Sequence, residues 1–151
     1  MNLKDHLLSR ETVALKAHAS DWRHAVKIGT DLLERAGTVT PAYYEEILKS
    51  TQEHGPYFLL APGIAMPHAR PEAGVLETSY ALVTLQTPVV FGDPDNDPID
   101  ILITLAAADA TTQNQEAIVQ VVTLVDSAAA VAALRTATTV AELRKIFAEV
   151  G

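Results

Sequence analysis

The 151-residue chain contains no cysteine, so disulfide frameworks, thiolate zinc sites and cysteine nucleophiles are excluded. Basic residues are also scarce: 11 Lys and Arg stand against 19 Asp and Glu, which gives 11 − 19 = −8 as the formal charge. A chain this acidic lacks the basic face that general nucleic-acid binding requires, so no nucleic-acid partner is expected. Nucleophilic chemistry is left chiefly to Ser, Thr, Lys, the carboxylates and five histidines.

Long apolar runs are missing as well. The richest segment, residues 99–110, is interrupted by Asp100, Thr104 and Asp109, and no run reaches the 18 or so apolar residues of a membrane span. Asp5 falls where a signal peptide would begin its apolar core. We therefore expect a cytoplasmic protein. The 48% apolar content is enough for a folded core, and the length predicts one domain over residues 1–151.

Two amphipathic helices are predicted in the first third of the chain. Apolar residues recur at helical spacing over residues 21–36, with Ser20 as the expected N-cap and Gly37 as the stop. A second helix is expected from Pro41 to His54, because proline suits the first helical position and Gly-Pro follows. His6 is expected to lie in a frayed amino-terminal segment without a role.

The chain then changes to short apolar runs separated by Gly and Pro, which is typical of strands and loops. Strands are expected over residues 13–17, 57–61, 64–66, 79–87 and 99–107. The last run is apolar on both faces after Asp100, which favours a central strand covered by helices above and below. Three more helices are expected, with Thr111 or Thr112, Ser127 and Thr139 as their N-caps. The prediction is an α/β fold: a three-layer α/β/α domain with a central mixed sheet of about five strands.

Two groups of residues have the composition of a metal site but not its spacing. Residues 93–98 carry carboxylates at alternate positions, as a calcium loop does, yet the sixth position is Pro98 and no closing glutamate follows, which favours a solvated turn. His18, Asp21 and His24 lie across an expected boundary between strand and helix, so a surface role is favoured over metal ligation. We expect no metal and no cofactor.

Residues 55–71, GPYFLLAPGIAMPHARP, carry the most informative pattern. An apolar strand leads through Pro67 to His68, and Arg70 follows two residues later. Side chains at i and i+2 of an extended chain project to the same side, so the imidazole and the guanidinium can face one anion. From the residues alone two interpretations stay open. His68 is a nucleophile beside a cation that matches phosphate oxygens, or it is a hydrogen-bonded polar residue in a proline-rich loop.

The segment GIAMPH at residues 63–68 resembles the phosphohistidine motif of the IIA components of the bacterial sugar phosphotransferase system, in the mannitol/fructose class. The sequences GPY at 55–57, PHARPE at 67–72 and DNDPIDILIT at 95–104 are similar to the ascorbate-type branch of that family. The resemblance covers nearly the whole chain.

The resemblance implies a phosphotransferase component that acts as a phosphohistidine relay. His68 takes a phosphoryl group from the carrier HPr and passes it to a cysteine of a IIB component, while a membrane IIC component, contacted only indirectly, imports the sugar, here ascorbate. The chemistry agrees with this role, because an imidazole with a pKa of about 6.5 is mostly neutral and nucleophilic at cytosolic pH.

One position departs from the family pattern. Relatives usually carry a second histidine near the start of the helix after the central strand, and Gln113 stands at the matching place. A glutamine amide donates a hydrogen bond but carries no charge. We expect Arg70, or His54 at the end of the second helix, to supply part of the missing positive character. His54 has an alternative role as a cation at the helix C-terminus. Packing is favoured over a sugar platform for Trp22, Tyr43 and Tyr44, because aromatic side chains bury large areas, and Tyr57 is left without an assignment.

Two alternative functions remain open. The first is a regulatory module of the same family that signals through phosphorylation of His68. The second is a non-catalytic module in which His68 and Arg70 hold an anion. The sequence also leaves open whether the chain forms a homodimer, which imidazole nitrogen reacts, although the resemblance favours Nε2, and which isomer the Met66–Pro67 bond adopts.

Overall fold

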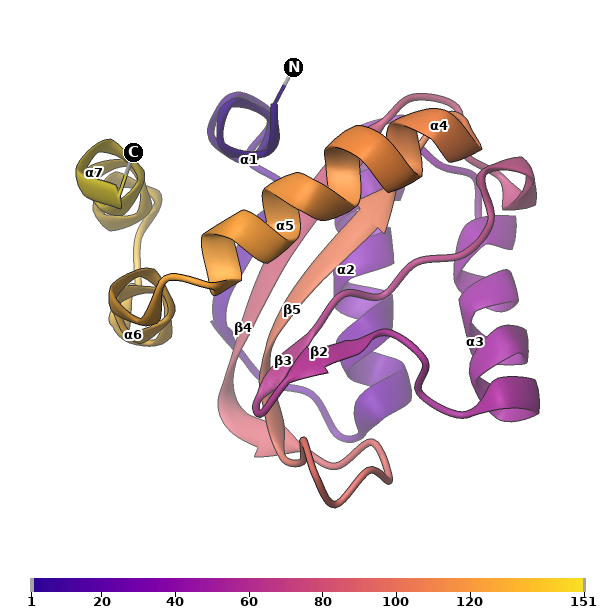
Figure 1. Cartoon of the computed structure of the whole chain (residues 1–151), viewed down its shortest axis with the longest axis horizontal. Coiled ribbons are helices and arrows are strands. Elements are labelled where there is room, and N and C mark those ends of the chain that lie inside the picture. The colour runs from indigo at the N-terminus through magenta and orange to yellow at the C-terminus, as the bar shows by residue number, and fades with distance from the viewer. Residues whose placement is uncertain (1, 151) are drawn as a thin grey trace.

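The computed structural model describes residues 2–150, in which five strands form one mixed sheet in the order β1-β4-β5-β3-β2 (Figure 1). β4 pairs antiparallel with β5, whereas β1 runs parallel to β4 and β3 runs parallel to β5. β2 closes the other edge antiparallel to β3. All five expected strands are present: β1 Val13–Ala17, β2 Leu59–Ala61, β3 Ile64–Ala65, β4 Ser79–Val89 and β5 Ile99–Ala106.

The predicted central strand is confirmed as β5, which lies in the middle of the sheet. Ile101, Ile103 and Leu105 contribute to the core on one face, while Leu102 and Ala106 contribute to the core on the other. Because strand side chains alternate between faces, only a strand with helices on both sides buries both sets.

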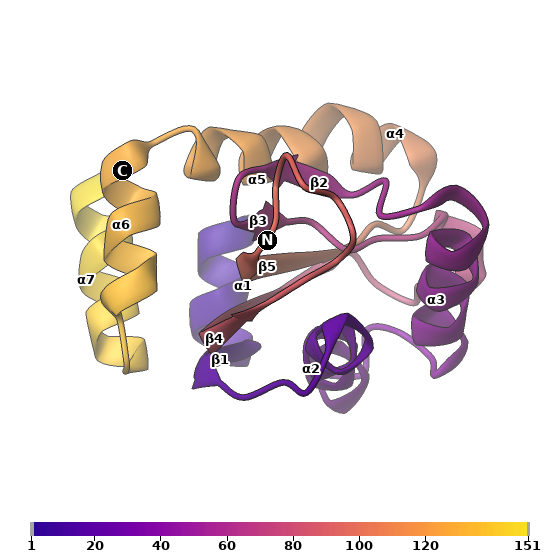
Figure 2. The ribbon, with the colours of Figure 1, turned by 90° about the horizontal axis from the view of Figure 1, so that it is seen from below.

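Helices cover both faces, so the expected three-layer α/β/α architecture is confirmed (Figure 2). α2 and α3 pack on one face, and α1, α5, α6 and α7 pack on the other. Within residues 2–150 no single helix is long and apolar enough to cross a bilayer; residues 110–125 and 128–136 reach that length only together, across a bend of 79°. The helices and helical turns are α1 Leu3–Arg10, α2 Trp22–Arg35, α3 Ala42–His54, η1 Pro71–Ala73, α4 Ala110–Thr112, η2 Gln113–Ala117, α5 Ile118–Val125, α6 Ala128–Thr136 and α7 Val140–Val150.

The prediction of a frayed amino-terminal segment is wrong, because residues 3–10 form α1 and bury His6 to 1% exposure. Leu3, His6 and Leu7 have the i, i+3, i+4 spacing of a buried helix face. A histidine occupies one core position of this face, so a search for apolar residues alone does not detect it. Its Nδ1 lies 3.4 Å from the Thr12 hydroxyl.

Two predicted N-caps are also wrong, and in both cases an aspartate takes the position. Asp21 rather than Ser20 caps α2, and its carboxylate accepts the N–H three residues on at 2.9 Å. Asp109 rather than Thr111 or Thr112 caps the helical segment after β5, with the equivalent hydrogen bond at 2.7 Å. A carboxylate at the positive end of a helix adds charge stabilisation to the hydrogen bond that a hydroxyl would make. The caps expected for the last two helices are confirmed: Ser127 and Thr139.

The acidic segment 93–98 forms a turn that satisfies its own carboxylates. The Asp97 carboxylate accepts the N–H groups of residues 91, 92 and 93, each at 2.8 Å. The Asp93 carboxylate accepts hydrogen bonds from the Asn96 side chain at 2.8 Å and the Asp95 N–H at 3.0 Å. These contacts favour the turn over a calcium loop.

Candidate functional site

His68 lies on the loop that follows β3, where β5 holds the backbone in place. Met66 continues the strand pairing, since its N–H donates to the Phe58 carbonyl at 2.8 Å. The Pro67 carbonyl accepts the Leu105 N–H at 3.0 Å. Among residues 2–150 only Asp97–Pro98 is a cis peptide bond, so the Met66–Pro67 bond is trans. The histidine is therefore presented from the end of a paired strand, not from a free loop.

The imidazole of His68 is held with one nitrogen facing its own backbone. Nδ1 lies 2.8 Å from the Met66 carbonyl oxygen. Because a carbonyl only accepts, the contact places the proton on Nδ1 and leaves the lone pair on Nε2. Burial lowers the pKa of His68 below its ordinary value, and the bond to Met66 only partly offsets this effect. The ring is consequently neutral at neutral pH, which is the nucleophilic state.

Tyr57, which the sequence left without a role, contacts His68 in two ways. Its hydroxyl donates to the His68 carbonyl oxygen. Its ring meets the imidazole edge-on, with 5.4 Å between the centroids and 80° between the planes. The GPY sequence that carries Tyr57 was noted for its resemblance, but nothing in it reveals a contact with a residue eleven positions away.

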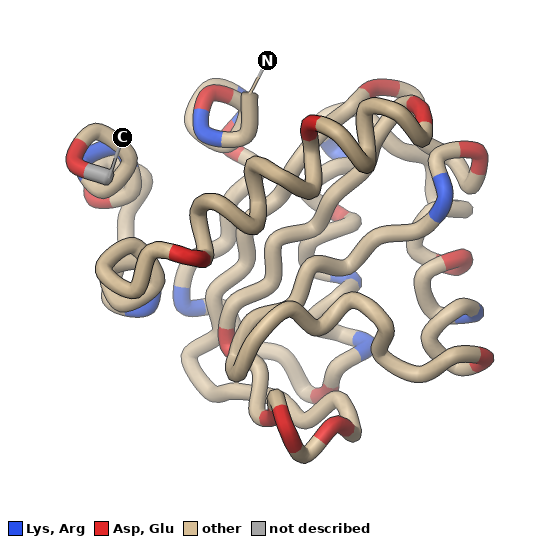
Figure 3. The backbone as a smooth tube through the Cα atoms, in the orientation of Figure 1, with Lys and Arg blue, Asp and Glu red and all other residues tan. Residues whose placement is uncertain are grey.

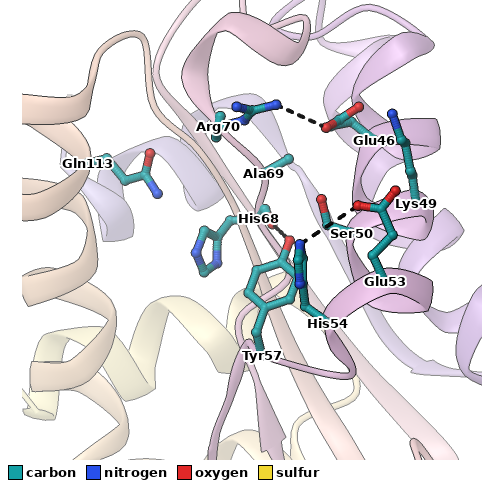
Figure 4. A pocket seen from close by; sticks show the side chains of 10 residues that line it. All are labelled: Glu46, Lys49, Ser50, Glu53, His54, Tyr57, His68, Ala69, Arg70 and Gln113. Carbon is teal, nitrogen blue, oxygen red and sulfur yellow. Dashed lines mark hydrogen bonds and ion pairs between the residues drawn. The ribbon is translucent and has the colours of Figure 1, made fainter.

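A pocket of about 510 Å³ surrounds this pair and is drawn in Figure 4. It lies between the α3 helix, the His68 loop and the first residue of η2. The four residues predicted for the site, His68, Arg70, Gln113 and His54, all line it. Their roles in the reaction stay predictions. Six further residues complete the lining: Glu46, Lys49, Ser50, Glu53, Tyr57 and Ala69.

Arg70 is the predicted anion ligand, and in this structure its guanidinium faces two carboxylates. Nη2 lies 3.6 Å from the Glu46 carboxylate (Figure 4). Nε lies 3.9 Å from the Glu72 carboxylate, and the Arg70 side chain is 76% exposed. Exposed pairs at such distances contribute about 0–1 kcal/mol. These contacts leave the guanidinium weakly paired and largely exposed at the pocket.

His54 occupies the last turn of α3, so both of its predicted positions hold. It lies at the negative end of the helix dipole and also lines the pocket. Its side chain is 70% exposed, with Nε2 3.7 Å from the Glu53 carboxylate. In the group of His18, Asp21 and His24, two members act at the start of α2. His24 Nδ1 accepts the Ser20 N–H at 3.1 Å, and the Asp21 carboxylate caps the helix.

Gln113 stands across the pocket from His68 (Figure 4) and is the first residue of the π-helical turn η2. π turns are rare and concentrate at functional sites, because the extra residue re-aims a side chain. The Gln113 amide can donate a hydrogen bond into the pocket, but it carries no charge.

Apart from His54, sequence reasoning missed the contribution of α3 to the site. Tyr43 is fully buried, as expected for a packing residue, but its hydroxyl also accepts the Ala69 N–H at 3.0 Å, directly beside His68. Glu46 pairs with Arg70 one turn further along the same helix. Helical periodicity places both residues on one face, yet it does not tell which loop that face meets.

Comparison with known proteins places this geometry in a family. Residues 6–150 match the model for the phosphoenolpyruvate-dependent sugar phosphotransferase system, EIIA 2. The ascorbate-specific PTS system EIIA component of Shigella boydii is 54% identical over 124 residues, which are 82% of this chain and 80% of that protein. The protein of the same name from Salmonella typhimurium is 48% identical over 143 residues, which are 95% and 93% of the two chains.

Solved structures agree. The mannitol-specific cryptic phosphotransferase enzyme IIA CmtB from Escherichia coli superimposes with a TM-score of 0.84 at 36% identity, covering 99% of both chains. Sequence match and fold match therefore extend over the same length of chain. The chain belongs to the EIIA type 2 family of the phosphoenolpyruvate-dependent sugar phosphotransferase system.

Proposed function

We propose that this protein is the phosphocarrier of an ascorbate uptake system. His68 Nε2 takes a phosphoryl group from phosphorylated HPr and passes it to the cysteine of a IIB component. The observation that carries the proposal is the orientation of His68, whose Nδ1 bonds to Met66 and whose Nε2 is left free beside a pocket with one guanidinium. The chain acts as one domain over residues 1–151, in the cytoplasm, and meets the membrane IIC component only indirectly.

The transfer balances without a proton. An N–P bond forms at Nε2 while the donor's N–P bond breaks. The proton remains on Nδ1 throughout, hydrogen-bonded to the Met66 carbonyl. In the second step the N–P bond breaks as a thiolate attacks phosphorus. Such a transfer needs alignment and charge stabilisation more than covalent machinery.

Three side chains of the pocket stabilise the phosphoryl group in this proposal. Arg70 leaves Glu46 and supplies two parallel donors that match phosphate oxygens. Gln113 donates its amide N–H from the opposite side. His54, at the rim, adds charge only when protonated.

The relatives support the choice of sugar in this proposal. Two relatives with about half of their residues in common with this chain are named for ascorbate. Enzyme IIAMTL from Escherichia coli, solved in complex with phosphorylated enzyme IIBMTL, has the same fold with a TM-score of 0.78 at 24% identity. At that identity the likeness shows the fold alone, and a IIB acceptor for this chain is part of the proposal.

The proposal is tested by incubation with enzyme I, HPr and phosphoenolpyruvate, followed by the intact mass of the protein. We expect a gain of one phosphoryl group that is absent in His68→Ala and retained in His24→Ala, which alters a histidine at the start of α2. Addition of the IIB component should then move the group to IIB. A gain that IIB does not remove would indicate the regulatory alternative, and no gain in the wild type would leave only the anion-binding one.

A further inference from the structure

The peptide group that joins His68 to Ala69 is held at both of its polar atoms by tyrosine hydroxyls. The Tyr57 hydroxyl donates to the carbonyl oxygen of His68, and the Tyr43 hydroxyl accepts the N–H of Ala69 at 3.0 Å. The two tyrosines come from different elements, Tyr43 from α3 and Tyr57 from the segment before β2. We call this arrangement the tyrosine clamp.

Tyr43 is the buried half of the clamp. Its hydroxyl donates to the Leu105 carbonyl at 2.5 Å while it accepts the Ala69 N–H, so its single proton and one lone pair are both used. Leu105 in turn donates its N–H to the Pro67 carbonyl. Burial raises the pKa of Tyr43, which keeps the hydroxyl protonated. This half ties the residues around the nucleophile to the central strand.

Tyr57 is the exposed half, with 41% of its surface accessible at the rim of the pocket. The Tyr57 ring meets the imidazole of His68 edge-on, and the Tyr57 hydroxyl donates a hydrogen bond to the backbone carbonyl of the same histidine. Burial raises the pKa of Tyr57, so the hydroxyl remains a donor through the neutral range. In Figure 4 the Tyr57 ring lies directly beside the His68 ring.

The clamp restricts the rotation that would misdirect the nucleophile. With the 68–69 peptide fixed on both sides and Nδ1 bonded to Met66, the imidazole keeps one orientation. Misplacement of a reacting group by about 1 Å costs on the order of 100-fold in rate.

Resting on the proposed function of His68, we infer that Tyr57 and Tyr43 are positioning residues, which act through His68 to aim Nε2 at the incoming phosphorus. Tyr57 contributes the hydrogen bond that can be removed without opening the core. Tyr43→Phe leaves buried groups of Ala69 and Leu105 without partners and destabilises the fold, so it does not carry the test.

The test compares Tyr57→Phe with Tyr44→Phe in single-turnover phosphoryl uptake from phosphorylated HPr. Tyr57→Phe keeps the ring and removes only the hydroxyl. Tyr44→Phe is the matched control, since its hydroxyl donates to the Arg23 carbonyl at 3.2 Å on an exposed surface, away from the clamp. We expect uptake about 5–10-fold slower in Tyr57→Phe, the size of one net hydrogen bond, and no comparable loss in Tyr44→Phe.

A second measurement is independent of the reaction. Carbon and nitrogen NMR of the unphosphorylated protein should show changed shifts at the His68 carbonyl and imidazole in Tyr57→Phe, and unchanged shifts there in Tyr44→Phe. A Tyr57→Phe protein with wild-type uptake, or one with slow uptake and unchanged His68 shifts, overturns the inference. A wild type that takes up no phosphoryl group instead refutes the proposed function of His68, and this outcome is distinct because it needs no variant.

Discussion

Removal of the Arg70 guanidinium should slow phosphoryl uptake by His68 by about 5–30-fold. Arg70 is the one residue of the pocket that combines a permanent charge, two parallel donors and a place two residues from the nucleophile. Its present partners are carboxylates, at 3.6 Å for Glu46 and 3.9 Å for Glu72. The expected rate loss reflects the free energy of the contacts from Arg70 to the phosphoryl group, less the free energy of the carboxylate contacts that it gives up.

The magnitude follows from two contributions. A hydrogen bond to a charged group contributes about 1.5–3 kcal/mol. Release of Arg70 from its exposed carboxylate partners costs up to about 1 kcal/mol, because the side chain is 76% exposed and both distances are long. The two contributions leave a net stabilisation of the transition state of about 0.5–3 kcal/mol. The middle of that range, about 1–2 kcal/mol, corresponds to about 5–30-fold in rate.

Rapid-quench measurement of kcat/KM with phosphorylated HPr as donor tests this estimate. Gln113→Ala should cost less than Arg70→Ala, because the amide donates one hydrogen bond without a charge of its own, whereas the guanidinium supplies a charge and two parallel donors. Arg35→Ala is the control for net charge, since it removes an equal charge from the exposed end of α2. Equal losses in Arg70→Ala and Gln113→Ala would refute the assignment of the charge role to Arg70.

Three further predictions concern the same structure. Glu46→Gln removes the carboxylate that holds Arg70 and should raise the uptake rate by about twofold in the same assay, the effect of a weak exposed pair; a slower variant would contradict it. Gly29→Ala should lower the free energy of unfolding in urea by about 1–3 kcal/mol, because an added Cβ would lie 2.2 Å from the Thr104 hydroxyl oxygen; Thr104→Ala in the same chain should recover part of the loss, and additive losses would contradict the clash. Burial and then Arg10 lower the folded-state pKa of His6, with a smaller opposing effect of Glu77. Neutral His6 therefore contributes fully to the free energy of unfolding above the unfolded pKa of about 6.5, and this contribution is lost as pH falls towards the folded pKa. Between about pH 7.5 and about pH 5, the free energy of unfolding in urea should therefore fall less in His6→Phe than in the wild type. Equal decreases would contradict the contribution of His6.

Sequence reasoning was most successful where periodicity and burial coincide. The apolar run of β5 predicts a strand covered on both faces, and the structure confirms it because both sets of alternating side chains reach a core. The same reasoning failed for α1, where His6 occupies a core position, and for two N-caps, where an aspartate outcompetes a neighbouring hydroxyl. A local pattern holds no information on which polar side chain the fold will bury.

The sequence predicted that His68 and Arg70 lie at one pocket, but it predicted less of what surrounds them. The PHAR sequence points to His68 and Arg70 by their spacing, and the family resemblance adds Gln113. The tyrosine clamp depends on contacts between residues 11 and 26 positions apart, and no spacing rule predicts such pairs. The π turn that begins at Gln113 cannot be predicted from helical periodicity either, because its hydrogen bonds do not follow the 3.6-residue repeat of an α-helix.

The central claim is that Nε2 of His68 is the atom that carries the phosphoryl group. Phosphorus and nitrogen NMR of the phosphorylated protein, followed by brief acid treatment, tests it most directly. The hydrogen bond from Nδ1 to Met66 predicts an N–P bond at Nε2, with Nδ1 still protonated, and loss of the group in acid. A linkage at Nδ1, or a phosphoryl group that survives acid as a hydroxyl ester would, contradicts the account.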